Sequence, residues 1–483
     1  MNINISNTRE CFFDDMLIDT NKTTAEFRLH RPVRKNTVLV HDEMWEGDNC
    51  CYHNFFWDDG IYRMYYLGAS TFKASGMFVD DVSVCYAESK DGINWTKPSL
   101  HICKVNDSDD NNIILDLSMV HHGHSIDNFM VFKDTNPNCG DDKRYKAILR
   151  LGDDGDDGLY CMFSSDGIHF NFGGTLTTEG NFDSLNVAFW DETARCYRCY
   201  FRGYHAPGDT AVGVNTDENN IRDIRYMEST DFIHWTKPRW LEFGDDREIS
   251  LYTNCVQSYQ RAKHILIGFP SRYLFRRNWN GSFDELPGRE RRIERMNRYK
   301  RYGLVLTDCI FMTSRDGINF KRYNEAFMAP GPEGETNWGY GDCYPARGFI
   351  ETKSEVEGAA DELSMLVPEG EWSGCPTRLV RYSIRCDGFR SAHAGESEKI
   401  LVTKPFVFSG SDLFVNFETS ALGYMYFTIV DKDGTRYESE ETFGNSIDRK
   451  VYFGDDVVKN LSGKLVTLEV RMCDSDLYSI MFR

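Results

Sequence analysis

The chain has 483 residues, of which 41% are hydrophobic and 14% aromatic, and its 75 acidic and 55 basic residues give a formal net charge of −20. Nucleic acids and anionic membrane surfaces are bound largely through clustered Lys and Arg, so this acidic balance argues against both partners. No apolar run of about 18 residues is present, which argues against a membrane-spanning helix.

The first residues, MNINISNTRECFFDD, lack the basic and apolar regions of a signal peptide. The 15 cysteines are an odd number spread along the chain, unlike the framework of a small disulfide-rich fold. We therefore expect mostly free, buried thiols, a cytoplasmic location, and neither a metal nor a cofactor.

From about residue 41 one pattern recurs along the chain: two strands, a third strand, then a Ser-x-Asp-Gly turn before a fourth strand. The second strands of the units lie at 61–68, 144–152, 196–203, 263–270 and 363–370. The turns read YAESKDGINW, CMFSSDGIHF, YMESTDFIHW, FMTSRDGINF and, more weakly, YSIRCDGF, which aligns Asp91, Asp166, Asp231, Asp316 and Asp387. Five copies without a clear helical segment between them indicate an all-β repeat fold.

The repeats predict a five-bladed β-propeller over residues 41–394, because a single four-stranded unit cannot bury both of its faces. In each turn the Ser and Asp side chains are expected to bind local backbone N–H groups, while the following aromatic residue packs between blades. Residues 1–40 are expected to pack on the propeller as a closing strand or a lid. Residues 395–483, with alternating strands and a hairpin turn at 431–434, predict a β-sandwich.

The candidate chemistry lies at the starts of the inner strands, which converge on the propeller axis. These starts are the segments 44–54, 120–128, 180–186, 248–255 and 337–347. Their acidic residues are Glu46, Asp48, Asp127, Asp183, Glu248, Asp342 and the nearby Glu335, and the aromatic residues Trp45, Tyr252, Trp338 and Tyr340 accompany them. An acidic pocket with an aromatic rim suits glycosidic bond cleavage, in which one carboxyl protonates the leaving oxygen and another attacks the sugar or activates water.

The five blades, the Asp-Gly-aromatic turns and the C-terminal β-sandwich resemble the family 32, 43 and 68 glycoside hydrolases, most closely the family 32-like set that includes β-fructosidases. The resemblance is carried by MWEGDNCCYHNFFWDDGIYRMYY, NFDSLNVAFWD, TDCIFMTSRDGINF, TKPFVFSGSDLFVN and DLYSIMF. It implies an aspartate at the first blade, an aspartate at the third and a glutamate at the fourth.

Two of these three positions differ from the family pattern. No aspartate stands at 50–54, where Glu46 and Asp48 are the nearest acids, and no glutamate stands at 252–255. Asp183 does match the third-blade position. The resemblance therefore implies Asp183 as transition-state stabiliser or pKa tuner, with Glu46 or Asp48 as nucleophile or base.

We therefore predict a glycoside hydrolase that acts on a small oligosaccharide, β-fructosidase-like or arabinosidase-like, with Glu335 or Asp342 as its acid. The predicted substrate-binding residues are Trp45, His124, Asp127, Arg202, Tyr252, Asn254 and Trp338. The alternatives are a glycoside phosphorylase or transglycosidase, and a non-catalytic carbohydrate-binding propeller. A homo-oligomer is compatible with the sequence.

Two further segments carry unusual residues. Residues 276–303 in the fourth blade are rich in arginine, and they form either a solvated, salt-bridged insertion or a source of arginines that bind a phosphate or a sugar carboxylate. His121, His122 and His124 cluster near the second blade, where contact with substrate hydroxyls is favoured over a metal site.

Overall fold

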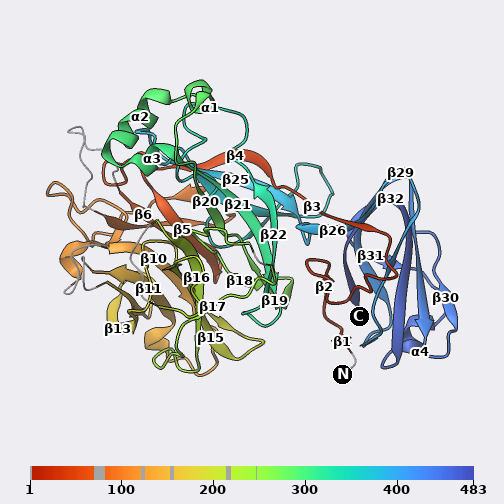
Figure 1. The fold of residues 1–483 in the computed structure, drawn as a ribbon. Helices are drawn as coiled ribbons and strands as arrows, with labels where there is room; N and C mark the ends of the chain where they lie inside the picture. Colours follow the sequence, from red (N-terminus) through yellow and green to blue (C-terminus); the bar gives the residue numbers. More distant parts are fainter. Residues whose placement is uncertain (1–2, 70–81, 121–125, 153–156, 214–218, 246) are drawn as a thin grey trace.

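The computed structural model describes residues 3–69, 82–120, 126–152, 157–213, 219–245 and 247–483. It confirms the predicted all-β architecture: a five-bladed propeller stands beside a second body built from N-terminal and C-terminal strands (Figure 1). No helix among the described residues is long and apolar enough to cross a membrane.

The first three blades follow one another along the chain, and each consists of antiparallel strands in sequence order. The first contains β5 (Cys51–Asp58), β6 (Ile61–Gly68), β7 (Ser83–Ser89) and β8 (Trp95–Thr96), with β9 (Ile113–Leu115) also paired to β7. The second contains β10 (Ile126–Lys133), β11 (Tyr145–Leu151), β12 (Gly158–Ser164) and β13 (Asn171–Thr177). The third contains β14 (Val187–Asp191), β15 (Cys196–His205), β16 (Ile221–Ser229) and β17 (Arg239–Trp240).

The last two blades depart from this simple order. The fourth contains β18 (Gln257–Tyr259), β19 (Ala262–Gly268), β20 (Ser271–Phe275), β21 (Val305–Ser314) and β22 (Phe320–Met328). The fifth contains β23 (Ile350–Thr352), β24 (Glu362–Glu369) and β25 (Arg378–Arg385), and its outer strand is β4 (Val33–Val40). Strand β4 precedes the first blade in the sequence, whereas β23, β24 and β25 follow the fourth blade. The fifth blade is therefore built from strands at both ends of the propeller sequence.

The repeated turn has the predicted architecture in the first four blades. In the first copy, Asp91 Oδ1 accepts hydrogen bonds from the backbone N–H groups of Ile93 and Asn94, at 2.9 and 2.7 Å, and Ser89 Oγ accepts one from Gly92 at 2.8 Å. The same bonds recur around Asp166, Asp231 and Asp316. These aspartates therefore organise turns.

Each turn packs against the preceding blade. Tyr65 of β6 donates a hydrogen bond to the carbonyl of Gly167 at 2.8 Å, and Tyr200 of β15 donates one to the carbonyl of Gly317 at 2.9 Å. A Cβ atom at Gly317 would collide with Arg198, so the turn approaches its neighbour closely because it carries glycine.

Asparagines at the inner strands connect neighbouring blades through the backbone. The Asn54 side chain donates to the carbonyl of Phe129 at 2.8 Å, and Asn128 donates to the carbonyl of Phe182 at 2.7 Å. Asn254 likewise donates to the carbonyl of Tyr200 at 3.3 Å. Amides serve here because each satisfies buried backbone groups without adding charge.

The second body is one hydrogen-bonded sheet that wraps around its own core. Its strands are β1 (Ile3–Ser6), β2 (Glu10–Cys11), β3 (Glu26–Leu29), β26 (Arg390–Ala394), β27 (Lys399–Val402), β28 (Phe406–Phe408), β29 (Leu413–Asp431), β30 (Arg436–Glu438), β31 (Asn445–Val451) and β32 (Leu465–Phe482), with helix α4 (Val457–Leu461). Alternate residues of both halves of β29, such as Val415 and Phe427, belong to the same buried cluster.

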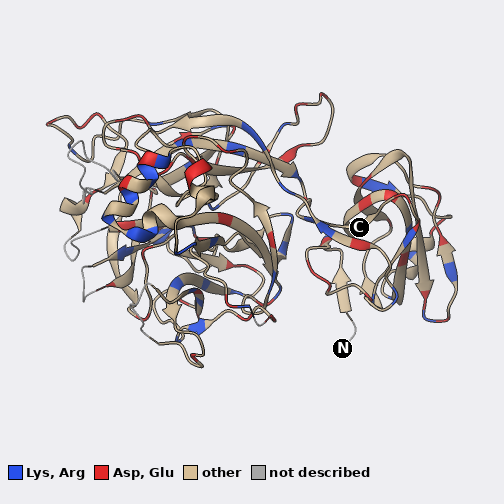
Figure 2. Ribbon diagram, turned by 45° about the horizontal axis from the view of Figure 1, so that its top comes forward, with Lys and Arg blue, Asp and Glu red and all other residues tan. Residues whose placement is uncertain are grey.

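The arginine-rich segment forms three helices between β20 and β21, at the side of the propeller away from the second body (Figure 1). They are α1 (Gly281–Glu285), α2 (Arg289–Arg298) and α3 (Lys300–Leu304). Figure 2 shows basic and acidic residues interspersed along these helices.

Candidate active site

A cluster of tyrosines lies where the first, third, fourth and fifth blades meet. Tyr252 stacks on Tyr273 and Tyr344, with ring centroids 5.9 and 5.4 Å apart. Its hydroxyl donates to the backbone carbonyl of Asp183 at 2.9 Å and accepts from the Tyr340 hydroxyl at 3.0 Å. The Tyr52 hydroxyl lies 3.1 Å from the Tyr252 hydroxyl. Stacked rings with fixed hydroxyls provide both the apolar faces and the polar edges that a sugar needs.

Two arginines lie over these rings. Arg202 of β15 is buried, forms an ion pair with the Asp183 carboxylate and has its guanidinium 5.0 Å from the Tyr252 ring centroid. Arg222 of β16 lies 3.7 Å from the centroid of Tyr273. The cations hold the tyrosine faces and the Asp183 carboxylate in one arrangement.

Asp127 of β10 is a second carboxyl in this region. Its Oδ2 lies 3.7 Å from Nη1 of Arg150, which also donates to Asp157 at 2.6 Å. Burial raises the pKa of Asp127, although Arg150 and Arg202 oppose the increase. The region therefore combines one carboxyl disfavoured in its ionised form with Asp183, which an arginine pairs.

Asp342, which is partly buried, and Glu371, which is buried, form a further pair of carboxyls contributed by two loops of the fifth blade. Burial raises the pKa of Asp342 to about 7, against opposing effects of the Gly339 N–H group and of nearby arginines. Burial raises the pKa of Glu371 well above its usual range, and Asp342 raises it further. Asp342 Oδ2 accepts from Gly339 N–H at 2.7 Å, whereas Glu371 Oε1 has no partner among the described residues.

The two carboxyl groups of the fifth blade lie close to the tyrosine region. Burial raises the pKa of the Cys51 thiol, and both Glu371 and Asp127 raise it further. Tyr340, two residues before Asp342, bonds to Tyr252 and packs edge-on against Trp372 with centroids 4.9 Å apart. Two carboxyls whose pKa values are raised by burial therefore lie near Asp183, which is paired with Arg202.

The first-blade acids lie elsewhere. Glu46 is fully buried, accepts from Tyr66 at 2.6 Å and pairs with Lys97 at 2.7 Å. Burial opposes ionisation, but these partners and His41 lower the pKa of Glu46 to about 2. Asp48 is also buried, and it accepts from the N–H of Gly374 at 3.1 Å.

The remaining predicted residues are divided between the tyrosine region and other places. Arg202, Tyr252, Asp127 and Asp183 come together, whereas the Asn254 side chain is engaged with backbone groups. Trp45 donates to Asn112 at 2.8 Å and packs with a cluster of the first and fifth blades. Glu335 is exposed, Glu248 lies in a separate pocket beside His205, and His121, His122 and His124 lie outside the described residues.

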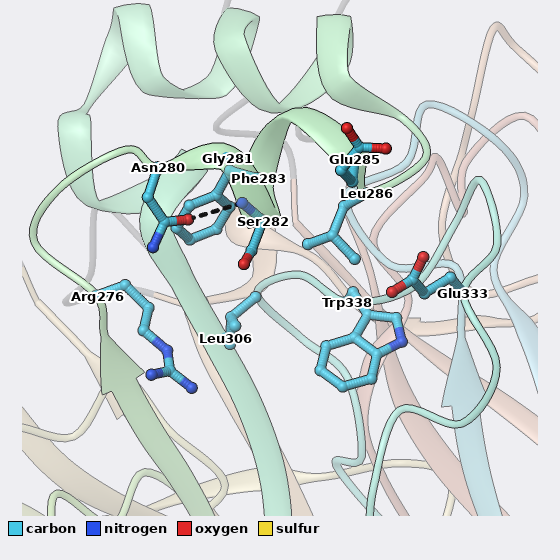
Figure 3. Close-up of a pocket in the computed structure, with 10 residues that line it drawn as sticks. All are labelled: Arg276, Asn280, Gly281, Ser282, Phe283, Glu285, Leu286, Leu306, Glu333 and Trp338. Atoms are coloured by element: carbon cyan, nitrogen blue, oxygen red, sulfur yellow. Dashed lines mark hydrogen bonds between the residues drawn. The ribbon is translucent and has the colours of Figure 1, made fainter.

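Trp338 lines a separate pocket of about 580 Å³ between α1 and the 333–338 loop (Figure 3). Leu286, Leu306 and Trp338 surround this space in the close-up, with Arg276 and Glu333 on opposite sides. The Trp338 indole donates to the carbonyl of Gly331 at 2.9 Å and packs with the helix cluster rather than with Tyr252.

Sequence reasoning missed Glu371 and Arg150, because it considered only the starts of the inner strands. The second strand of each blade is antiparallel to the first, so its end lies at the same edge as those starts. Arg150 stands near the end of β11, and Glu371 follows the end of β24. A search of second-strand ends would have found both.

No protein-family model matches the chain, and no curated sequence is similar to it. Several solved structures share its outline at low identity. A thermostable family-43 glycoside hydrolase is 12% identical, with a TM-score of 0.42, over 72% of this chain and 92% of that one. A glycosyl hydrolase from Bacteroides ovatus is 12% identical, with a TM-score of 0.44, over 75% and 97%.

A third structure comes from work on the GH130 family of mannoside phosphorylases, described as containing glycoside hydrolases that target β-1,2 mannosidic linkages. It is 12% identical with a TM-score of 0.43, and the match covers 74% of this chain and 96% of that one. At these values the likeness is one of chain outline, and the chemistry of this chain rests on its own residues.

Proposed function

We propose that the protein is an enzyme that cleaves a glycosidic bond at the axis of its propeller. The observation that carries the proposal is the pair of high-pKa carboxyls, Asp342 and Glu371, next to a tyrosine cluster with arginine-paired Asp183. Burial favours the protonated form of the first pair, while Arg202 pairs with the Asp183 carboxylate.

Asp342 is the proposed general acid. Its proton moves to the glycosidic oxygen as the bond from that oxygen to the anomeric carbon breaks, so the departing sugar leaves as a neutral alcohol. A water molecule then adds its oxygen to the anomeric carbon and returns a proton to the Asp342 carboxylate. The pKa of about 7 is suited to this step, because the group is substantially protonated at neutral pH and still gives up its proton readily. Glu371, whose pKa burial also raises well above its usual range, lies beside it.

Asp183 is the proposed stabiliser of the positive charge that develops on the sugar ring. Arg202 fixes its carboxylate, and the hydroxyls of Tyr52 and Tyr252 hold its backbone carbonyl. Glu46 has no part in this proposal, because its carboxylate is enclosed by Lys97, Tyr66 and His41.

The test is cleavage of a panel of oligosaccharides by the wild-type protein and by Asp183→Asn, followed by chromatography of the products. We expect kcat to fall by about 10²-fold or more in the variant, because it lacks the negative charge that stabilises the positively charged sugar ring in the transition state. Glu357→Gln, at an exposed loop position, is the matched control. Undiminished kcat in Asp183→Asn would remove this residue from the proposal.

A further inference from the structure

Helix α2 presents arginines on its buried face, which is unusual for a short surface helix. Arg292 and Arg295 are only 5% and 9% exposed, while Arg291 and Glu294 face solvent. The spacing of three residues places both guanidiniums on the face that would ordinarily carry apolar side chains. Arginine is rarely buried to this extent unless it is paired.

These two arginines lack a paired anion among the described residues, although Asp342 attracts both of them and Asp48 attracts Arg295. Neither forms a salt bridge there, and the Nε atoms of both are buried without a hydrogen-bond partner. Burial lowers the pKa of Arg295 to about 10, with Arg292 contributing in the same direction. A buried cation that lacks a paired anion and a full set of hydrogen bonds is costly, so two of them held together point to a bound group that completes their contacts.

Both arginines line a small cavity next to the proposed acid. Its wall also contains Asp342, Glu371 and Tyr340. Nη1 of Arg295 lies beside Gly339, whose N–H group holds Asp342. Helix α2 begins at this cavity after Gly288, and no side chain caps its first turn, so its first N–H groups add to the positive potential.

We propose that this cavity is an oxyanion-binding site, which holds either inorganic phosphate as a co-substrate or the carboxylate of an acidic sugar. Arg292 and Arg295 supply charge-assisted hydrogen bonds, and the protonated carboxyls of Asp342 and Glu371 donate to the same anion. The binding of an anion in this cavity is inferred from the buried arginines. Only the role of that anion in the reaction rests on the proposed function.

Phosphate at this position would change the reaction. A phosphate oxygen attacks the anomeric carbon, the bond from that carbon to the glycosidic oxygen breaks, and the proton from Asp342 completes the leaving alcohol. The products are a sugar 1-phosphate and a shortened glycan, so atoms and charges balance without any oxidant or reductant. An acidic sugar, by contrast, would bind through its carboxylate and be hydrolysed by water.

The binding experiment is isothermal titration of the full chain with sodium sulfate, sodium phosphate and sodium glucuronate. We expect at least one anion to bind, and Arg295→Gln and Arg292→Gln each to weaken that binding at least tenfold. Arg289→Gln is the control, because that arginine lies on the same helix but pairs with exposed Asp284 at 2.9 Å. Circular dichroism verifies that each variant is folded.

The relative affinities identify the source of the anion. Tighter binding of phosphate and sulfate than of glucuronate assigns the site to phosphate, and the reverse order assigns it to an acidic sugar. Absence of binding by all three anions, or equal binding by Arg295→Gln and the wild type, overturns the inference. Because binding is measured without turnover, this failure is distinct from the absence of glycoside cleavage, which would overturn the proposed function.

The pH dependence of sulfate binding is a second readout, since sulfate keeps its charge over the range used. The charged groups that face the cavity are Arg291, Arg292 and Arg295 of α2, Glu335 and Asp342 of one loop and Glu371 of another, and Asp48 acts on Arg295 from the loop before β5. Sulfate affinity is expected to fall as pH rises through about 7, where Asp342 loses its proton. Affinity that rises with pH contradicts the site.

Discussion

Asp342 illustrates how a carboxyl shielded from water lowers the stability of its own fold. Because burial raises its pKa from 3.8 to about 7, the folded state retains a proton that the unfolded chain releases near pH 4. The stabilisation from this proton is complete below pH 4 and is lost as pH rises through 7. The pKa difference corresponds to about 4 kcal/mol above pH 7.

Asp342→Asn is therefore expected to be more stable than the wild type at pH 8, by up to about 4 kcal/mol, because it removes the penalty of a buried charge. The advantage should shrink by about half or more at pH 5. Urea unfolding at the two pH values measures the difference. An identical stability change at pH 5 and pH 8 would show that Asp342 titrates normally.

Only some residues of the candidate site could be predicted from the sequence. Asp183, Asp127, Arg202, Tyr252 and Asp342 were found because they stand at strand starts or beside a recognisable motif. The nearest first-blade acid, Glu46, looked equally suitable in the sequence. Its enclosure depends on Lys97 and His41, which lie 51 and 5 residues away, and no local pattern reveals these contacts.

At the scale of elements, the repeated turn was the most predictable feature, because its hydrogen bonds join residues only two or three positions apart. The number of blades was also predictable, because it equals the number of repeats. The arrangement of the helices at 281–304 was not, because the sequence indicates only a short helix or a long loop there and the positions depend on contacts with the 333–342 loop.

Gly317→Ala tests the close approach of a turn to the preceding blade. We expect it to lower the free energy of unfolding by at least about 2 kcal/mol more than Gly434→Ala. Both glycines have left-handed backbones, with φ of +86° and +83°, but a Cβ at Gly434 meets nothing within 4 Å. Thermal and urea unfolding measure both variants. Equal losses would mean that the backbone angle alone determines the cost.

At the scale of the whole molecule, Asp387 connects the propeller to the second body. This fifth copy of the turn aspartate is fully buried and, unlike the other four, contacts residues of both bodies. It pairs with Arg9 at 3.3 Å and Arg261 at 2.9 Å, and it accepts from Ser479 of β32 at 2.8 Å. Burial opposes its ionisation, but the two arginines keep the pKa of Asp387 below its usual range.

Asp387→Asn is expected to lower the free energy of unfolding by about 3 kcal/mol, because it removes the anion that pairs with buried Arg9 and partly buried Arg261. Asp448→Asn is the control, since Asp448 also pairs with Arg9 but is partly exposed, and its loss should cost about 1 kcal/mol or less. Urea unfolding near pH 7 measures both. A similar cost for the two variants would exclude Asp387 as the connection between the bodies.

The most direct test of glycosidic cleavage at the axis compares leaving groups in the wild type and Asp342→Asn. An oligosaccharide needs protonation of its leaving oxygen, whereas a 2,4-dinitrophenyl glycoside of the same sugar does not. We predict that kcat/KM of the variant falls about 10²- to 10⁴-fold for the oligosaccharide and less than tenfold for the aryl glycoside. Equal losses on both substrates, or no loss on the oligosaccharide, would contradict Asp342 as the acid.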